Sequence, residues 1–391
     1  MSFLRAARAA LAGQSCLPRS LVAVIAIAVL AGLSLSCGSS SHSTSGPNHN
    51  AYVTLPARGS VLLLHINGAT GAITLGAETP QVLATTPTGI ALLPSKKFLY
   101  AVNSFANTIS IFKVASDGTL ALTGTPTPAG GSSPNAAVID PSGKYLLVTN
   151  NLSNNVSVFS IDAGTGALSL VGSPVPANAN PAEILIVPSG KFVYVTNPGI
   201  GTVTAFTFSN GVLSQMPSSP FSSDLGAFGL AVDGSERFLY VANPAASNPP
   251  PFTSTTGNIS GFNIDPSTGA LTPILGSPFT ATNGNGPSAV TVDPSGKFVY
   301  AVTPGSSFSI WCFTITPTNG QLVAVTNSPF SLTAGGLFAL FDPSGNYLYI
   351  GSQDANGIAG YTYDPSTGAP TAIAGSPFST VAAPGKMVLS E

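Results

Sequence analysis

Short apolar segments separated by turn-forming residues repeat along most of this chain. The unit reads apolar strand, Asp-Pro-Ser-Gly-Lys turn, Tyr-Val-Thr-Asn strand, loop, amphipathic strand, Thr-Gly-Ala turn and last strand, and it recurs about every 47 residues. In the first turn, Pro sets φ at the second position and Gly takes the position least tolerant of a side chain, as in a hairpin corner. Six internal copies are visible, and their most recognisable parts are residues 94–103, 140–150, 188–197, 233–243, 293–303 and 342–352.

The two ends of the chain share one further copy of the repeat. Residues 51–55, 61–67 and 72–75 match its last three strands, and residues 384–389 match the missing first strand. A closed ring leaves no repeat end uncapped, whereas an open solenoid does not need such sharing. We therefore predict an all-β, seven-bladed β-propeller over residues 51–391, with four-stranded antiparallel blades and a ring closed by the N- and C-terminal strands in one blade.

One position of the third strand is apolar in every copy. Its residues are Leu64, Phe112, Phe159, Phe206, Phe262, Trp311 and Tyr361. We expect these side chains to pack between neighbouring blades. Trp311 is accordingly expected in the core, and a ligand platform is the alternative.

Composition agrees with a packed β-protein and excludes one class of partner. The chain is 44% hydrophobic, with 10 Tyr and 21 Phe, which argues against disorder even though only 7% of its residues are charged. Its 42 Gly and 34 Pro favour many short strands joined by tight turns. The net charge of −2 offers no basic face for phosphates, so we expect no nucleic-acid partner.

The N-terminus has the pattern of a targeting segment, and we predict a signal peptide over residues 1–36. Three arginines precede an apolar run over residues 21–35, which is too short for a comfortable transmembrane helix. Cys37 and the Ser/Gly-rich stretch behind it resemble the acylation site of bacterial lipoproteins, although Ser34 stands where Leu is usual. We expect a lipid-anchored linker over residues 37–50, export to the bacterial cell envelope, and membrane contact through the lipid only. A plain secretory signal and an uncleaved anchor are the alternatives.

The motif Tyr194-Val195-Thr196-Asn197 and the Asp-Pro-Ser-Gly-Lys turns together resemble the YVTN-type propellers and the related lactonase family typified by 6-phosphogluconolactonase. The resemblance covers residues 51–391. It implies the seven-bladed propeller fold and, as an activity, hydrolysis of a sugar-acid lactone. The matching residues are turn and strand formers, so they specify the fold.

Motifs of common catalytic sites are missing from the sequence. It contains no Gly-x-Ser-x-Gly elbow, phosphate-binding glycine loop, His-Glu-x-x-His or paired Cys motif, so we predict no metal and no cofactor. His65 and Cys312 align at one polar position of the third strand, and we expect a surface histidine and a packed thiol without a disulfide partner. The basic residues of the first turn are expected to be solvated and spaced around one rim; they are Lys97, Lys144, Lys191, Arg237 and Lys297.

Charged residues at the channel mouth are the strongest candidates for a functional site. The first strands begin with Gly89, Ala136, Glu183, Gly229, Ala289, Phe338 and Lys386 at equivalent positions. Glu183 and Lys386 break a small or apolar pattern where desolvation of a charge is costly. Arg58, Asp224 and Asp354 fall in loops of the same face, the top face, and are expected to join the pair around a small polar ligand. A channel salt bridge or ordinary rim charges are the alternative.

Two functions fit these residues. The favoured one is an exported, envelope-anchored binding or scaffold module whose uncharged top loops contact a protein, a glycan or a small polar ligand. The alternative is a lactonase-family hydrolase in which Glu183 activates water while Lys386 and Arg58 hold the substrate or stabilise the oxyanion. The proline-containing loop over residues 243–258 is a candidate lid or partner contact.

Overall fold

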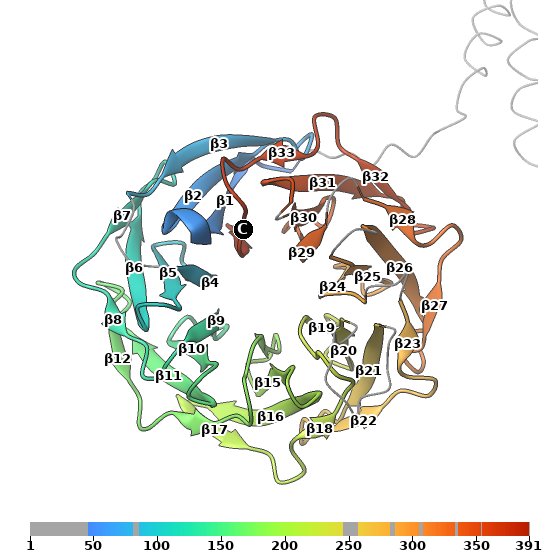
Figure 1. The fold of residues 1–391 in the computed structure, drawn as a ribbon, viewed down its shortest axis with the longest axis horizontal. Helices are drawn as coiled ribbons and strands as arrows, with labels where there is room; N and C mark the ends of the chain where they lie inside the picture. The colour runs from blue at the N-terminus through green and yellow to red at the C-terminus, as the bar shows by residue number, and fades with distance from the viewer. Residues whose placement is uncertain are drawn as a thin grey trace, which may run out of the picture. The chain divides into compact units, whose positions relative to one another are not determined.

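Seven antiparallel sheets surround a central channel like the blades of a propeller (Figure 1). The computed structural model describes residues 46–80, 86–244, 257–281, 286–304, 308–332, 335–352 and 354–390. Within them the predicted all-β, seven-bladed propeller is confirmed. The only helical element of these residues is a 3-10 turn, η1 (Pro56–Arg58), and none of their helices is long and apolar enough to cross a membrane.

Each blade has four main strands, numbered here from the channel outward. The first strands are β34 (Met387–Leu389), β4 (Pro87–Leu92), β9 (Pro134–Ile139), β14 (Ile184–Ile186), β19 (Leu230–Val232), β24 (Ala289–Val292) and β29 (Gly336–Phe341) for blades 1 to 7. The second strands are β1 (His49–Leu55), β5 (Phe98–Asn103), β10 (Tyr145–Asn150), β15 (Phe192–Asn197), β20 (Phe238–Asn243), β25 (Phe298–Val302) and β30 (Leu348–Ser352).

The outer strands follow in the same order. The third strands are β2 (Ser60–Ile66), β6 (Thr108–Val114), β11 (Asn155–Ile161), β16 (Thr202–Ser209), β21 (Asn258–Ile264), β26 (Ser309–Ile315) and β31 (Gly357–Tyr363). The fourth strands are β3 (Ile73–Glu78), β7 (Leu120–Leu122), β12 (Leu168–Leu170), β17 (Val212–Gln215), β22 (Leu271–Pro273), β27 (Leu322–Ala324) and β32 (Pro370–Ala372). In blades 2 to 7 a short strand also pairs with the third strand; these are β8 (Thr127–Pro128), β13 (Val175–Pro176), β18 (Phe221–Ser222), β23 (Phe279–Thr280), β28 (Phe330–Ser331) and β33 (Phe378–Ser379).

Both chain ends complete blade 1, as the split repeat predicted. Strand β34 pairs antiparallel with β1, with Tyr52 opposite Val388 and Val53 opposite Met387. Strand β1 begins at His49, and the predicted signal peptide and Cys37 lie outside the described residues. Most of the loop over residues 243–258 also lies outside them.

In six of the seven blades the tyrosine of the Tyr-Val-Thr-Asn strand connects the blade to the next one, and in blade 3 Leu147 holds its position. The hydroxyl of Tyr52 donates to the Gly118 carbonyl oxygen at 2.9 Å, and the same bond recurs from Tyr100, Tyr194, Tyr240, Tyr300 and Tyr349 to the matching turn glycines. The bond from Tyr349 to Gly71 joins blade 7 to blade 1 at 2.8 Å. Because a buried hydroxyl needs a partner, this contact accounts for a tyrosine at this position of the motif.

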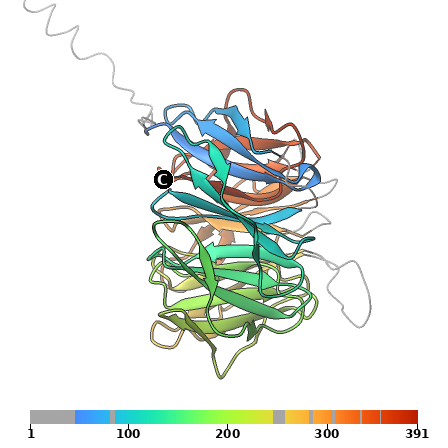
Figure 2. The ribbon, with the colours of Figure 1, turned by 90° about the vertical axis from the view of Figure 1, so that its left-hand side faces the viewer.

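The hydrophobic core is divided into seven clusters, one between each pair of neighbouring blades. Seen from the side, the strands run across the thickness of the ring, so each cluster lies between two facing sheets (Figure 2). The turn aspartates cap the backbone as expected: Asp140 Oδ1 accepts the N–H groups of Lys144 and Tyr145 at 2.8 and 2.6 Å.

Blade 6 differs from the predicted register. Val299 pairs with Phe313, as Leu99 pairs with Phe112 in blade 2, so Phe313 rather than Trp311 holds the aromatic position of the third strand. Phe313 is buried, whereas Trp311 is only half-buried and stacks on the Phe313 ring at 6.1 Å between centroids. The alignment of Cys312 with His65 is wrong for the same reason, because Thr314 occupies that position.

Candidate functional site

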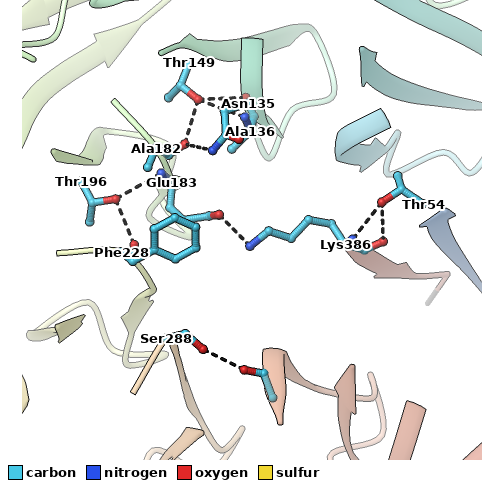
Figure 3. A network of polar contacts seen from close by, with 11 residues as sticks. Thr54, Asn135, Ala136, Thr149, Ala182, Glu183, Thr196, Phe228, Ser288 and Lys386 are labelled. Atoms are coloured by element: carbon cyan, nitrogen blue, oxygen red, sulfur yellow. Dashed lines mark hydrogen bonds and ion pairs between the residues drawn. The ribbon is translucent and has the colours of Figure 1, made fainter. Parts of the chain in front are cut away.

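An ion pair crosses the channel at its top face, which is formed by the loops between second and third strands. Glu183 lies just before β14 of blade 4, and Lys386 lies just before β34 of blade 1. Their side chains extend toward each other across the opening (Figure 3), with 2.6 Å between Lys386 Nζ and Glu183 Oε1. The structure therefore brings together the two charged residues singled out from the sequence, in the salt bridge that was the alternative to a ligand site.

The pair is partly shielded from solvent. The side chain of Glu183 is 16% exposed and that of Lys386 is 29% exposed. The Lys386 ammonium also lies 5.6 Å from the centre of the Phe228 ring, where the aromatic face attracts a cation. Apart from the ion pair, Glu183 Oε1 has no hydrogen-bond partner among the described residues. This oxygen therefore keeps capacity to accept a proton or a hydrogen bond.

Two buried threonines hold the backbone under both charged residues. Thr196 Oγ1 accepts the Glu183 N–H at 3.1 Å and donates to the Phe228 carbonyl oxygen at 2.9 Å. Thr54 Oγ1 accepts the Lys386 N–H at 2.9 Å. One hydroxyl thus positions both the carboxylate and the ring beside the ammonium, and a second one positions the ammonium.

Polar contacts between blades continue around the mouth (Figure 3). Thr149 Oγ1 donates to the Ala182 carbonyl oxygen at 2.9 Å, and the Asn135 amide donates to the same oxygen at 3.1 Å. Ser288 Oγ donates to the Gly336 carbonyl oxygen at 2.8 Å. These bonds fix the starts of the first strands, which supply the side chains of the mouth.

Of the other three predicted ligand-binding residues, Arg58 and Asp224 have partners elsewhere. Arg58 forms two hydrogen bonds with Glu78 on β3, at 2.7 and 2.9 Å, and these bonds hold the pKa of Glu78 below its usual value. Asp224 Oδ2 accepts from the Asn258 amide at 2.6 Å. Asp354 is exposed in the β30–β31 loop. Within the described residues, none of the three forms a salt bridge with Glu183 or Lys386.

The histidine and cysteine behave as the sequence indicated. His65 is exposed and its Nδ1 lies 2.8 Å from Asn50 Oδ1. Cys312 is buried, its thiol donates to the Gly368 carbonyl oxygen at 3.4 Å, and burial raises its pKa to about 12. Two of the basic turn residues contact neighbouring loops on the bottom face: Arg237 donates to the Pro317 carbonyl oxygen at 2.8 Å and Lys297 to the Pro365 carbonyl oxygen at 2.9 Å.

One cavity lined by described residues lies away from this ion pair. It has a volume of about 690 Å³ at the opposite end of blade 1, next to both described chain ends, and His49 and His65 line it. The described residues contain no group of three or more His, Cys, Asp or Glu side chains that would hold a metal ion.

Sequence reasoning missed Phe228, Thr54 and Thr196. The threonines had a signal, because Tyr-Val-Thr occurs as residues 52–54 and 194–196, in the two blades that carry the charged residues. The equivalent residue is Val102, Ala242, Val302 or Gly351 in four other blades, and it is Thr149 in blade 3, where the hydroxyl accepts the Ala136 N–H without a charged residue at the mouth. Phe228 had no comparable signal, since it precedes the repeat position that was aligned.

Comparison with known proteins gives one family and several structures of the same fold. The family described as Lactonase, 7-bladed beta-propeller matches residues 42–181, 173–277 and 252–383. A search of the curated proteins finds no match. A Bacteroides fragilis protein proposed to be a 6-phosphogluconolactonase is 20% identical over 90% of this chain and 100% of its own, with a TM-score of 0.75. A similar protein from Bacteroides uniformis is 19% identical over 88% of this chain and 100% of its own, with a TM-score of 0.74.

A third structure, the periplasmic gluconolactonase of Pseudomonas aeruginosa, is 18% identical over 88% of this chain and 99% of its own, with a TM-score of 0.71. At such identities the likeness of these structures extends to the fold alone. The family match is broader evidence, because its segments together span most of the sequence. The chain belongs to the lactonase family of seven-bladed β-propellers.

Proposed function

We propose that this protein hydrolyses a sugar-acid lactone at the mouth of its channel. The observation that carries the proposal is the Glu183–Lys386 pair, at 2.6 Å and partly exposed, in a protein of the lactonase family. Ester hydrolysis needs a base to activate water and a positive charge to stabilise the oxyanion, and the pair supplies both. A binding or scaffold role of the top face stays a prediction.

Each proton has a place in this reaction. The Glu183 carboxylate takes a proton from water as the hydroxide adds to the lactone carbonyl carbon, and the Lys386 ammonium stabilises the negative charge on the former carbonyl oxygen. When the intermediate collapses, the bond from the acyl carbon to the ring oxygen breaks, and protonated Glu183 returns its proton to the leaving alkoxide. The product is the open hydroxy acid, which releases its carboxylic proton to solvent. Thr196 and Thr54 hold the two charged residues in position.

The substrate class follows from the proposed location of the protein. We also propose that the chain is exported and anchored through a lipid on Cys37, as the N-terminal pattern indicates. Phosphorylated lactones are made inside the cell, so an exported enzyme acts on uncharged aldonolactones. The periplasmic gluconolactonase of Pseudomonas aeruginosa, similar in fold, supports this choice.

The test is hydrolysis of glucono-δ-lactone, galactono-γ-lactone and 6-phosphogluconolactone, followed as proton release in a pH-stat and corrected for spontaneous opening. We expect activity on the first two substrates, and a loss of about 10²–10⁴-fold in kcat for Glu183→Gln or Lys386→Met. Glu236→Gln, which changes a half-buried glutamate in the bottom-face turn between β19 and β20, is the matched control and is expected to keep full activity. The proposal is overturned if the wild-type protein hydrolyses none of the three lactones faster than they open spontaneously. Full activity of Glu183→Gln would show that the catalytic site does not lie at the mouth.

A further inference from the structure

A groove opens on the top face between blades 2 and 3, outside the ion pair. It has a volume of about 430 Å³, within the range of small-molecule sites. Phe105 of the β5–β6 loop and Leu152 of the β10–β11 loop line it, together with hydroxyl and amide side chains such as Thr86, Ser104 and Asn107. The groove therefore combines two apolar surfaces with a set of neutral polar groups.

The two apolar side chains are unusually open to solvent. Phe105 is 77% exposed and Leu152 is 68% exposed. Neither contributes to the clusters between blades, so packing does not explain them. Exposed apolar side chains gathered at one concave place mark an interaction site more often than isolated ones do.

The polar wall of the groove is held in place across the two blades. Ser104 Oγ and Ser133 Oγ lie 3.1 Å apart, and Asn107 Oδ1 accepts the Ser133 N–H at 2.6 Å. Asn107 and Ser133 both have positive φ angles, 57° and 51°, a backbone conformation that L-residues adopt at some cost. Because these contacts leave the Asn107 amide nitrogen pointing to no described partner, its two N–H groups are available to a ligand.

The chemistry of the lining selects one class of ligand. The described residues that line the groove carry no charge, so it offers no partner for a phosphate, a carboxylate or a cation. Six hydroxyl or amide side chains line the groove, and a purely apolar ligand would cover them without forming hydrogen bonds, which is unfavourable. A neutral sugar matches both parts, because its C–H face packs on an aromatic ring while its hydroxyls bond to Ser, Thr and Asn.

We propose that this groove binds a neutral saccharide unit, with Phe105 as the stacking platform and Asn107 as the hydrogen-bond donor. The site does not use Glu183 or Lys386, so it stands independently of lactone hydrolysis. The groove and the ion pair nevertheless open on the same face, since Thr88 of the groove directly precedes the mouth residue Gly89. A polysaccharide of the cell envelope that binds in this groove would hold the channel mouth next to the saccharide chain.

The experiment is isothermal titration of the full chain, in a zwitterionic detergent that carries no sugar, with maltotriose, cellotriose and chitotriose up to about 10 mM. Gluconate, an anion of similar size to one sugar unit, is the control ligand, and it is titrated into Lys386→Met so that the proposed catalytic pair does not hold it as a product. We expect at least one trisaccharide to bind with a Kd of about 10⁻⁴–10⁻³ M and gluconate not to bind. Phe105→Ala and Asn107→Ala should each weaken binding about tenfold or more.

Matched variants keep the result decisive. Leu275→Ala removes an apolar side chain that is 80% exposed on another blade, and it should leave the Kd unchanged. Leu152→Ser tests the second apolar wall without touching the core, should Phe105→Ala unfold. The proposal is overturned if no trisaccharide binds wild type, if Leu275→Ala weakens binding as much as Phe105→Ala, or if gluconate binds as tightly as the sugars.

Discussion

Replacing Thr196 with valine tests whether the scaffold positions the proposed catalytic pair. The side chain is fully buried, and its hydroxyl accepts from the Glu183 N–H at 3.1 Å and donates to the Phe228 carbonyl oxygen at 2.9 Å. Valine has nearly the same shape, so the change removes the two hydrogen bonds and little else. The Thr196 hydroxyl supports both members of the ion pair. It binds the backbone of Glu183 directly, and it binds the backbone of Phe228, whose ring lies under the Lys386 ammonium.

The size of the effect follows from those two bonds. Each hydrogen bond contributes about 0.5–1.5 kcal/mol, so Thr196→Val should lower the free energy of unfolding by about 1–3 kcal/mol. The ring tolerates such a residue, since Val102 and Val302 hold the equivalent position in blades 2 and 6. A carboxylate that is free to shift should lower kcat for lactone hydrolysis about tenfold, which corresponds to about 1.4 kcal/mol in the barrier.

The assay pairs urea unfolding with steady-state hydrolysis of glucono-δ-lactone. Thr204→Val is the matched control: Thr204 is equally buried, accepts from the Asn178 amide at 2.9 Å and donates to Asn197 Oδ1 at 2.7 Å, so it also loses two hydrogen bonds, but neither partner belongs to the ion pair. Both variants should lose similar stability. Only Thr196→Val should show the tenfold loss of kcat, and the control should keep a kcat close to that of wild type. Equal losses of kcat in the two variants, or an unchanged kcat in Thr196→Val, would refute a positioning role.

Three further predictions concern the scaffold. Tyr349→Phe removes the one hydrogen bond to Gly71 that joins blades 7 and 1, and urea titration should report a loss of about 0.5–1.5 kcal/mol in the free energy of unfolding; an unchanged midpoint would contradict the role of this bond. Because burial raises the pKa of Cys312 to about 12, a thiol reagent at pH 8 should label it only upon unfolding, and rapid labelling of the folded protein would contradict its burial. Burial also raises the pKa values of Tyr52 and Tyr363 from 10 to about 12, so their neutral forms stabilise the fold fully below pH 10. That contribution is lost between pH 10 and 12, and a free energy of unfolding that stays flat over this interval would argue against it.

The turn residues and the tyrosine motif are sufficient to predict the fold. They are not sufficient to predict the strand register of blade 6. The loop between its second and third strands is one residue longer than in blade 2: Val302 pairs with Ile310, whereas Val102 pairs with Ile109. An error of two residues leaves every side chain on the same face of a strand, so the apolar pattern alone does not detect it. The apolar pattern therefore places Trp311 at the core position that Phe313 occupies in the structure.

The sequence predicts which residues form the candidate site, but it does not predict how their side chains are arranged. Glu183 and Lys386 were found because charge breaks an apolar pattern, yet they lie three blades apart in a ring. Whether two such side chains meet depends on the channel width and on the direction of each strand start, which local sequence does not encode. The pairing of Arg58 with Glu78 likewise needs the bend of the β1–β2 loop toward β3.

The mouth itself limits which blades can carry a functional side chain. A Cβ atom added to Gly89 would lie 2.7 Å from the Asn135 carbonyl oxygen, and one added to Gly229 would lie 2.8 Å from Ala289 Cα, so blades 2 and 5 approach their neighbours too closely for a side chain. The ring thus leaves room for long side chains at only some of its seven equivalent positions, and the ion pair occupies two of them. Scaffold residues recur in every blade because every blade must pack, whereas the mouth acts through the few positions that depart from the repeat. Membership of the family therefore implies that this chain has the propeller fold, but it does not identify the residues that act chemically. Catalysis has to be tested at Glu183 and Lys386 directly.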